Sequence, residues 1–242
     1  MRYAIISDIH SNFIALEQVL ERIDSEKCDK IICLGDIVGY GPFPNECIEL
    51  VKKKSDKVIA GNHDHAAAGL LEMDYFNIYA KKAIEWTITA LKDENKKYLQ
   101  TLPMHEYTND AFFVHATPMI PERWGYILTP HQAKLNFEYF DQQICFIGHS
   151  HLPVIFSYNG KKESEMIYDS EIKFKNNLKY IINVGSVGQP RDHSAQAAFG
   201  IYDTEKKLYK LLRVNYDVYT IQKAMMSLDF PEFLIERLKY GR

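Results

Sequence analysis

The sequence lacks the features that direct a chain to a membrane or to nucleic acid. No apolar run among its 242 residues approaches the length needed to cross a bilayer. The opening stretch MRYAIISDIHSN does not have the charged, apolar and small-residue layout of a signal peptide. The formal net charge of −3 provides no basic footprint for a polyanion. We therefore expect a cytoplasmic protein with no membrane partner and no specific nucleic-acid partner, although a nucleotide substrate is compatible with these features.

Cysteine is also scarce, and its spacing does not suggest a disulfide or zinc framework. Cys28, Cys33, Cys47 and Cys145 form no C-x-x-C pair, and Cys33 and Cys145 lie inside apolar runs typical of strands. These features predict reduced thiols in a core. There is also no low-complexity linker and no repeat of fixed period. A single domain over residues 1–242 is therefore the simplest organisation.

The first hundred residues alternate between strand-like and helix-like patterns. The composition, 46% hydrophobic and 25% charged, supplies material for a sizeable core. Phe13, Leu16, Leu20 and Ile23 recur at helical spacing and predict a helix over about residues 11–24. Pro44 suits the first turn of a second helix over residues 45–53. Strands alternating with helices predict a parallel sheet covered by helices. The expected strands of this half are residues 2–7, 30–34 and 57–60.

The second half of the chain reads as a second sheet. One helix is expected there, over residues 130–139, and a last helical stretch begins at Tyr219. A second sheet packed on the first, with helices outside both, explains this order. Residues 66–102 are expected to be helical throughout and to form an insertion over the strand ends. The expected strands are residues 111–114, 144–147, 154–157, 180–184, 200–202 and 208–214.

Polar side chains directly follow five of the expected strands. In a sheet covered by helices, the loops after the carboxyl ends of the strands gather at one edge, where ligands bind. A spacing of two lets both members of a pair such as Asp8 and His10 point the same way if the backbone stays extended. Each stretch alone is weak evidence, because a polar loop or a hydrogen-bonded histidine explains it as well. The stretches are Asp8-Ile9-His10, Gly35-Asp36, Gly61-Asn62-His63-Asp64, Val114-His115 and Gly148-His149-Ser150-His151.

Their joint occurrence favours a metal site. Five of the nine histidines fall in these stretches, together with carboxylates and a carboxamide. Imidazole and carboxylate ligands suit Mn, Fe, Zn, Ni or Co better than Mg or Ca, and the ion that is loaded depends on availability. The sequence thus predicts a transition-metal site at one edge of the sheets.

The ordered set of stretches resembles the motifs of the calcineurin-like metallophosphoesterase superfamily. The wider stretches SDIHSNFIAL, GDIVGYGPFPNECI and NVGSVGQPRD resemble its small prokaryotic phosphodiesterase branch, which includes diadenosine-tetraphosphatase-related proteins. The resemblance implies an α/β (α+β) fold, a four-layer αββα sandwich of two mixed sheets with helices on the outer faces. It also implies two divalent transition-metal ions per chain. Carried over position by position, it implies one ion held by Asp8, His10 and His151, a second held by Asn62, His115 and His149, and Asp36 bridging the two.

The resemblance further implies a hydrolytic mechanism. Two ions bring +4, while Asp8, Asp36 and a bridging hydroxide bring −3, which leaves about +1 to attract a phosphate. The hydroxide, shared by ions roughly 3.5–4 Å apart, would attack phosphorus in line. His63 stays off the metals and would protonate the leaving oxygen as general acid. Asp64 either holds that imidazole in position or caps the following helix, and the cap fits slightly better.

Residues flanking the motifs differ from those of the protein phosphatases in this superfamily. Those enzymes carry Asp-Arg after the second motif, whereas Gly39-Tyr40 stand here, which argues against a protein phosphatase. Arg191 and Arg123 are then the candidates for a phosphate clamp, because a guanidinium binds phosphate oxygens bidentately. Either of them could instead be a surface ion-pair residue. Asn12 is a candidate for a further hydrogen bond to the phosphate.

Other aromatic and histidine side chains show no pattern that ties them to the site. Trp86 and Trp124 are interpreted as packing residues rather than platforms for a nucleobase. His65 is interpreted as a helix-face residue, with contact to substrate as the alternative. His193 has no partner that the sequence identifies.

Together these features predict a dinuclear metal-dependent phosphohydrolase for phosphodiester, phosphomonoester or phosphoanhydride bonds in a small phosphate ester or nucleotide. A phosphodiesterase or dinucleoside-polyphosphate hydrolase is preferred. One alternative is a noncatalytic metal-binding interaction scaffold of the same fold, which His63 disfavours because a known scaffold of the superfamily lacks the acid histidine. The other is a nuclease-type phosphodiesterase, which would need a basic groove and is disfavoured by the net charge of −3.

Overall fold

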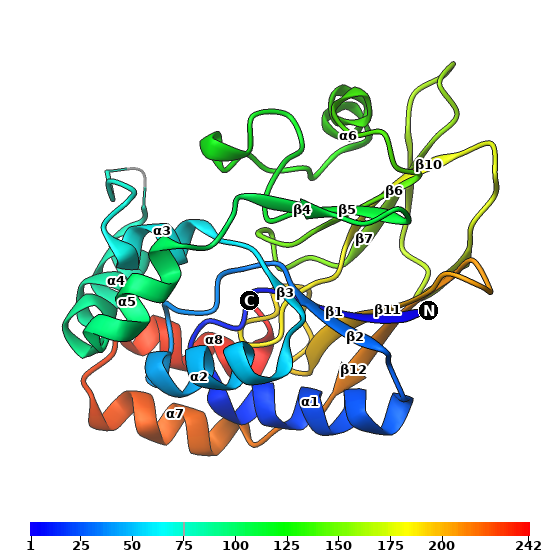
Figure 1. Ribbon diagram of the computed structural model, residues 1–242. Coiled ribbons are helices and arrows are strands. Elements are labelled where there is room, and N and C mark those ends of the chain that lie inside the picture. The colour runs from blue at the N-terminus through cyan, green and yellow to red at the C-terminus, as the bar shows by residue number, and fades with distance from the viewer. Residues whose placement is uncertain (75) are drawn as a thin grey trace.

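Two mixed six-stranded sheets lie face to face at the centre of the molecule (Figure 1). The computed structural model describes residues 1–74 and 76–242. The first sheet has its parallel strands on one side and its antiparallel strands on the other, whereas the second sheet has a parallel centre with antiparallel strands on both sides. The order in the first sheet is β3 (Lys57–Val58), β2 (Lys30–Cys33), β1 (Arg2–Ile6), β11 (Ala197–Asp203), β12 (Leu208–Val214) and β9 (Glu171–Lys173). The order in the second is β4 (His105–Tyr107), β5 (Ala111–Val114), β6 (Ile144–Ile147), β10 (Lys179–Asn183), β7 (Val154–Tyr158) and β8 (Glu165–Ile167).

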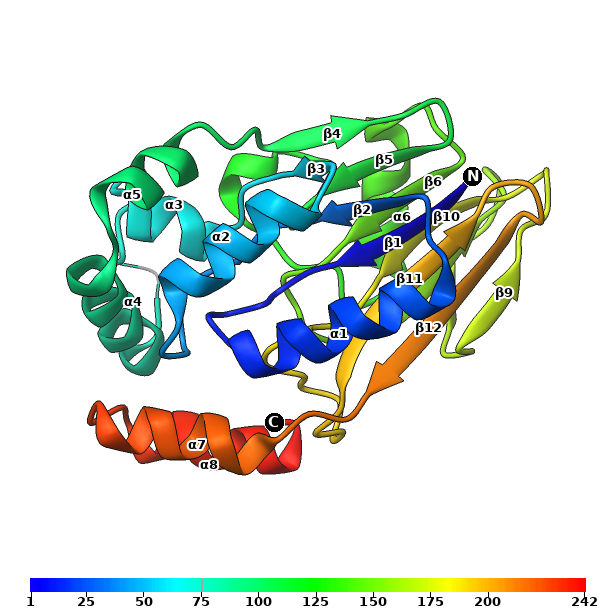
Figure 2. The same cartoon turned by 60° about the horizontal axis from the view of Figure 1, so that its bottom comes forward.

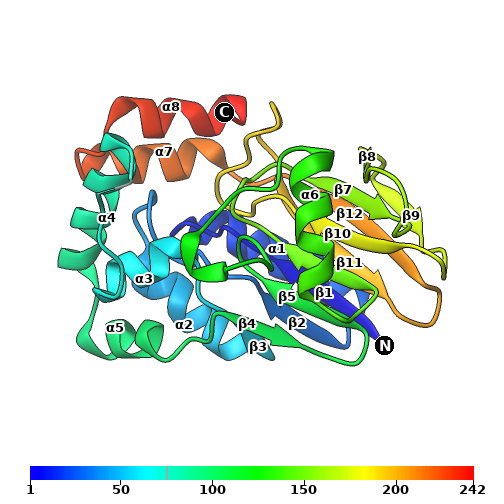
Figure 3. The ribbon, with the colours of Figure 1, turned by 90° about the horizontal axis from the view of Figure 1, so that it is seen from above.

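Helices cover the outer faces of both sheets. α1 (Phe13–Glu26) and α2 (Pro44–Lys54) lie along the first sheet (Figure 2), and α6 (Pro130–Asn136), continued by the short η2 (Phe137–Tyr139), lies on the second. The helices α3 (Asn62–Ala68), α4 (Ile78–Ala90) and α5 (Asp93–Gln100) gather at one end of the sheets (Figure 3). The expected fold of two mixed sheets with outer helices is therefore confirmed.

The strands of this fold are buried on both faces. In β1 the Ile5 side chain packs between the two sheets, whereas Ala4 and Ile6 pack toward α1. Between the sheets the fully buried ring of Phe146 stacks on Phe113 at a centroid distance of 5.7 Å. Strands covered on both sides read as continuous apolar runs rather than alternating ones. This explains why the apolar runs of the sequence located the central strands.

The segment 66–102 differs from its expected form. It is not helical throughout, because α3 ends at Gly69, whose left-handed backbone (φ 79°) forms the C-cap. α4 begins only after Asn77, whose side chain accepts from the backbone N–H groups of Tyr79 and Ala80. The final helical stretch is likewise divided, into α7 (Val218–Ser227) and α8 (Glu232–Tyr240). The short strands β4, β8 and β9 and the turn η1 (Pro121–Arg123) were not expected from the sequence.

The structure bears on the expectations about membrane-spanning helices and about the cysteines. Among residues 1–74 and 76–242, no helix combines the length and apolar character needed to cross a membrane. All four cysteines are free thiols, and Cys33, Cys47 and Cys145 are buried. The interpretation of these three as reduced core residues is confirmed, while Cys28 is only half-buried.

Candidate metal centre

The polar stretches meet where the parallel strands of the two sheets end. β1 and β2 lead into Asp8 and Asp36 in one sheet, and β5 and β6 lead into His115 and His149 in the other. Two groups of side chains result, and within each the candidate ligand atoms lie within 4.8 Å of one another. Asp36 belongs to both groups, as expected for a ligand that two ions share. The groups are Asp8, His10, Asp36 and His151, and Asp36, His115 and His149.

Close contacts between imidazoles and carboxylates define the first group. The Nε2 of His151 lies 3.3 Å from Asp8 Oδ1, and the Nε2 of His10 lies 3.6 Å from Asp36 Oδ2. The Nε2 of His115 reaches the same Oδ2 of Asp36 at 3.4 Å from the other group. All five side chains are buried. Among the described residues, no Lys or Arg forms an ion pair with the two carboxylates of this cluster, so the cluster needs positive charge from elsewhere.

The backbone at the site is left-handed rather than extended. Asp8, His10, Asp36, His149 and His151 have φ between 50° and 66°, a region that non-glycine residues rarely adopt. The expectation that an extended backbone aligns each Asp/His or His/His pair is therefore wrong. The loops turn sharply as soon as the strands end, and backbone hydrogen bonds between neighbouring loops hold the turns, as from Asp8 N to Gly35 O at 3.0 Å. Strained residues of this kind cluster at functional sites.

Hydrogen bonds to backbone carbonyls orient the imidazoles of His10 and His151. Nδ1 of His10 lies 3.1 Å from the carbonyl oxygen of Val38, and Nδ1 of His151 lies 2.5 Å from that of Gln189. A carbonyl only accepts, so each Nδ1 carries the proton and each Nε2 presents a lone pair. These two Nε2 atoms lie 3.0 Å apart in the protein interior. Two lone pairs that face each other repel, and a cation between them would turn this repulsion into attraction.

The second group has nitrogen and oxygen atoms without hydrogen-bond partners among the described residues, and these atoms could also bind a metal ion. Nδ1 of His115 donates to the carbonyl of Leu34 at 2.8 Å, and its buried Nε2 has no hydrogen-bond partner among the described residues. His149 is oriented the other way, because its Nε2 donates to the carbonyl of Trp124 at 2.9 Å and leaves Nδ1 free as the candidate ligand atom. The buried Oδ1 of Asn62 also lacks a partner. Buried polar atoms without partners are costly, and a divalent ion would satisfy these.

Apart from that of His115, the protonation states at the site are those that metal binding requires. Burial works against ionisation of Asp8 and Asp36, but the neighbouring imidazoles hold the pKa of both carboxyls below the usual range. Burial and nearby positive charge lower the pKa of His149 to about 3 and that of His151 below its ordinary value. Burial also opposes charging of His115, yet the Asp36 and Asp8 carboxylates raise its pKa to about 9. The site thus favours a cation at His115 Nε2, and a metal ion can replace the proton there.

The Asp64 carboxylate accepts hydrogen bonds from the backbone of two loops. Its Oδ1 accepts from the N–H groups of Ile37 and Val38 at 2.9 and 3.2 Å, and its Oδ2 accepts from Gly61 N at 3.0 Å. Burial and the nearby Asp36 charge raise the pKa of Asp64 to about 7. A Cβ on Gly61 would lie only 2.0 Å from an Asp36 oxygen, which explains the glycine that leads this turn. The structure therefore shows Asp64 in the helix-capping arrangement of the two alternatives.

The His63 imidazole stands beside the ligands and is enclosed by rings. Its centroid lies 4.8 Å from that of His10, 4.5 Å from Tyr40 and 5.1 Å from Phe76. Its buried Nδ1 has no hydrogen-bond partner in the described part of the chain and lies against Gly39. Burial lowers the pKa of His63 to about 4, although Asp36 acts in the opposite direction. The ring is thus positioned by packing rather than by a hydrogen bond from an acidic partner.

A cleft of about 550 Å³ opens directly over these residues. A larger hollow of about 890 Å³ lies on the second sheet beside β6 and β10, but none of the ligand side chains reaches it. We assign the functional site to the smaller cleft, because perturbed titratable groups and convergent polar atoms are found there. Its floor contains Tyr40, Asn62, His63 and His149, and its walls include Phe76, Arg123, Trp124 and Tyr126.

The three candidate phosphate-binding residues have different surroundings. Arg191 is half-buried, donates to Gln189 Oε1 at 2.9 Å, and lies with its Cζ 5.8 Å from the Tyr40 ring. Arg123 is exposed at the wall of the cleft. Asn12 is buried, accepts from Ala15 N as the cap of α1, and donates to Gly188 O at 2.9 Å. Both ends of the Asn12 side chain are thus used by the fold rather than offered to a phosphate.

The structure also brings in residues that the sequence did not single out for the site. Trp124 was interpreted as a packing residue, but its indole forms part of the cleft, whereas Trp86 packs on Phe230 as expected. Tyr126 stacks on His149 at 4.2 Å. These residues come from an irregular loop with no periodic pattern, so no signal in the sequence separates them from packing aromatics. His65 is half-buried, and its ring centroid lies 5.3 Å from that of Trp124 in an edge-on arrangement. His193 is exposed.

Comparisons with known proteins agree with this geometry. Residues 1–207 match the calcineurin-like phosphoesterase superfamily domain. The uncharacterized protein MJ0912 of Methanocaldococcus jannaschii is 41% identical over 243 residues, which are 99% of this chain and 98% of that protein. A metallophosphoesterase from Sphaerobacter thermophilus has a similar structure, with a TM-score of 0.88, 38% identity and coverage of 100% and 99%. Hypothetical protein PH1004 from Pyrococcus horikoshii OT3 shares the fold, with a TM-score of 0.81, 24% identity and coverage of 100% and 98%.

Proposed function

Because the chain belongs to the calcineurin-like phosphoesterase superfamily, we propose that it is a dinuclear metal-dependent hydrolase of small phosphate esters. The observation that carries this proposal is the pair of buried ligand groups that share Asp36, with His63 beside them on the same cleft. A phosphodiester or a dinucleoside polyphosphate is the preferred substrate. A noncatalytic scaffold would not need a buried imidazole held next to the ligands.

The donor atoms suit two divalent transition-metal ions. Asp8, His10 and His151 would hold one ion, the set of Asn62, His115 and His149 would hold the other, and Asp36 would touch both. Mixed imidazole and carboxylate donors favour Mn, Fe, Zn, Ni or Co. Such ions, when bound, supply Lewis-acid charge for the phosphoryl oxygens and acidify a water for attack.

The remaining steps fall to side chains on the cleft. In its protonated form, which the negative charge of a bound phosphate would favour, His63 donates a proton to the leaving oxygen, and Nε2 is the atom free to do so because Nδ1 lies against Gly39. Asp64 contributes by holding the turn that positions His63. Arg123 on the cleft wall and Arg191 beside the Tyr40 ring are the guanidinium groups proposed to bind the phosphate oxygens.

Metal reconstitution with matched variants tests the proposal. Chelator-treated protein is reloaded separately with Mn, Co, Ni, Zn and Mg, and bound metal is measured together with hydrolysis of p-nitrophenyl and alkyl phosphodiesters. We expect about two ions per chain in the best-loaded sample. Replacing His63 by Ala should retain the metal but slow alkyl esters by about 10²- to 10⁴-fold, with a smaller effect on the p-nitrophenyl ester, which needs little acid assistance.

His131→Ala is a suitable control, because His131 is exposed on α6, away from the cleft. It should match the parent in metal content and turnover. Failure of the parent protein to take up any of these metals would overturn the proposal. Parent-like hydrolysis of alkyl esters by the His63→Ala variant would remove the acid role.

A further inference from the structure

The cleft beside His63 has walls that are built from aromatic rings. We propose that these rings bind a planar base on the leaving group, so that the preferred substrates are phosphate esters whose leaving alcohol is a nucleoside. This inference rests on the proposed hydrolytic function and assigns the substrate class of that same site.

Two separate loops supply the rings. Phe76 comes from the connection between α3 and α4, and Trp124 and Tyr126 come from the loop between β5 and α6. In Figure 3 these two segments lie near each other at the end of the sheets where the parallel strands finish. A flat ring entering the cleft would meet aromatic surface from both loops, which is how proteins bind bases that are not paired.

Trp124 is placed for this role rather than for packing. Its indole belongs to none of the apolar clusters of the described residues, and its backbone is left-handed with φ 51°. The carbonyl of Trp124 accepts from Nε2 of His149, so the segment that presents the indole also orients a metal ligand. The centroid of its ring lies 6.0 Å from that of His115 and 5.3 Å from that of His65. The indole is therefore fixed beside the reacting phosphate.

Tyr126 and Phe76 flank the indole in a similar way. The ring of Tyr126 is nearly parallel to His149, with an interplanar angle of 19°, and the residue is 48% exposed. Phe76 meets His63 edge-on at 74°. Both residues thus extend the surface from the catalytic floor toward solvent, where the far end of a leaving group would lie.

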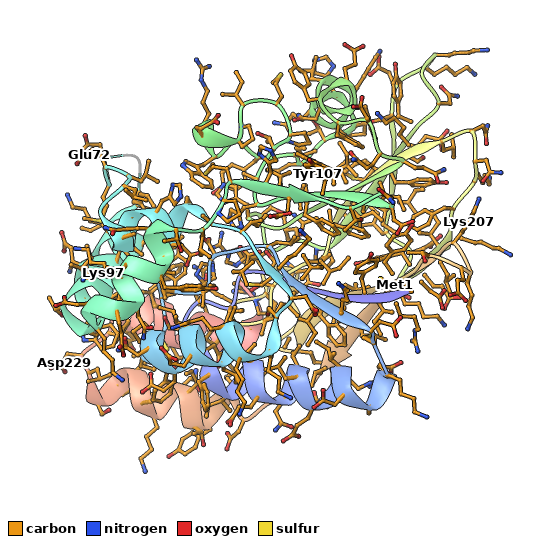
Figure 4. The ribbon with its side chains drawn as sticks, in the orientation of Figure 1. Met1, Glu72, Lys97, Tyr107, Lys207 and Asp229 are labelled. Carbon is orange, nitrogen blue, oxygen red and sulfur yellow. The ribbon has the colours of Figure 1, made fainter. Side chains whose placement is uncertain are left out.

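The outer wall offers acceptors for the polar edge of a base. Glu122 and Glu72 line the cleft, and Figure 4 shows Glu72 at the outer end of the α3–α4 connection. Neither carboxylate forms an ion pair with a described residue. Asn77, also on this wall, uses its Oδ1 to cap α4 and keeps its amide N–H groups for a ligand. Carboxylates accept from exocyclic amino groups such as those of adenine, guanine and cytosine.

The size and position of the cleft fit a nucleoside on the leaving side. Its 550 Å³ falls within the roughly 300–1,000 Å³ of small-molecule sites. His63 lies on the floor, so the group bound above it is the one that receives the proton. In the reaction, water forms a new bond to phosphorus and the bond from phosphorus to the nucleoside oxygen breaks. The proton of His63 goes to that oxygen, and a proton of the water is released.

Hydrolysis of matched substrates measures the contribution of the base. The pair is the methyl phosphodiester of adenosine at its 5′-oxygen and the same diester of ribose, which lacks the base. We expect kcat/KM to favour the adenosine ester by about 5- to 150-fold, mainly through KM, since stacking on an aromatic residue is worth about 1–3 kcal/mol. In ¹⁸O-water the label should appear in methyl phosphate rather than in adenosine monophosphate.

Variants separate the role of the rings from a general loss of structure. Trp124→Ala should bring the ratio of kcat/KM for the two esters close to one. Tyr107→Ala is the matched control, because Tyr107 is an aromatic residue on edge strand β4 that is 64% exposed and lies outside the cleft lining (Figure 4). It should keep the parent ratio. Loss of the preference in both variants, or in neither, would overturn the assignment.

A binding measurement distinguishes this inference from the hydrolytic function. The sequence has two tryptophans, so Trp86→Phe leaves Trp124 as the reporter. Adenosine monophosphate should quench its fluorescence, and ribose 5-phosphate should not. Quenching without turnover under any metal would support the aromatic subsite while the hydrolase proposal fails. Equal turnover of both esters with no quenching would overturn the subsite alone, as would a preference for glycerophosphocholine over the adenosine ester.

Discussion

Gly39 is predicted to be necessary for the position of the His63 imidazole. A Cβ added at Gly39 would lie 2.5 Å from Nδ1 of His63 and 3.2 Å from Cδ1 of Ile84. The imidazole would have to move by about 0.9 Å to reach the 3.4 Å at which ordinary contact begins. Tyr40 and His10 enclose the ring on other sides, so it has little room to move. Gly39→Ala should therefore misplace the general acid.

Two effects of this substitution can be given magnitudes. The φ of +92° at Gly39 is strained for alanine by about 1–2 kcal/mol, which lowers the melting temperature by roughly 2–8 °C for a chain of this size. Displacement of a reacting group by about 1 Å costs about 10²-fold in rate. We therefore expect turnover of alkyl phosphodiesters to fall about 100-fold. The fall should be smaller for p-nitrophenyl esters, whose leaving group needs little protonation.

The assay compares Gly39→Ala with Gly160→Ala. Gly160 has φ +78° but no atom within 4 Å of an added Cβ, so it carries the backbone strain without the contact to His63. Thermal unfolding should show a loss of stability from backbone strain alone at Gly160 and a loss at least as large at Gly39, where the contact with His63 is added. Steady-state kinetics on both ester types should show the rate loss only at Gly39. If the Gly39 variant hydrolysed alkyl esters as fast as the Gly160 variant, the position or the acid role of His63 would be refuted.

Four further predictions concern the candidate metal ligand Asp36, the loop contacts of Asp64, the packing of Phe146 between the sheets and the binding of phosphate by Arg191. Asp36→Asn should lose metal and activity together, because Asp36 joins both ligand groups; metal retention measured on the purified variant would contradict this. Asp64→Ala should lower the free energy of unfolding in urea by at least about 2 kcal/mol, since three backbone N–H bonds are lost, and an unchanged midpoint would argue against those bonds. Phe146→Ala should cost about 3–5 kcal/mol in the same measurement, and a cost below 1 kcal/mol would mean that the sheets are not packed through this ring. Arg191→Ala should raise KM for phosphate esters about tenfold with partial recovery in Arg191→Lys, because ammonium cannot bind bidentately; an unchanged KM would exclude the contact.

The side chains of the candidate metal centre could be predicted from the sequence because each of them directly follows a strand. Each ligand stretch follows an apolar run that forms a parallel strand, as Asp8 follows β1 and His115 follows β5. Parallel strands end at the same edge, so any polar residue placed there meets the others. The resemblance of the motifs to a known superfamily added the sharing of Asp36 between two groups. No knowledge of side-chain conformation was needed for either step.

The ends of the helices and strands and the irregular segments were harder to predict from the sequence. The break after α3 depends on a single left-handed residue, Gly69, inside a run whose composition is otherwise helical. Short edge strands such as β9 form only because β12 offers an edge to pair with. Their stability comes from the neighbour rather than from the propensity of their own residues.

What the sequence by itself determined is therefore the set of functional groups and the end of the sheets at which they gather. Tertiary structure alone decided which nitrogen of each histidine is free, because Val38, Leu34 and Gln189 supply the carbonyls from distant loops. It also decided that the Asp64 carboxylate accepts hydrogen bonds from backbone N–H groups and that Trp124 lines the cleft. The physical reason is that hydrogen-bond partners and cleft walls are contacts between remote segments. Local periodicity records which face of a strand or helix is buried, but not what that face will meet.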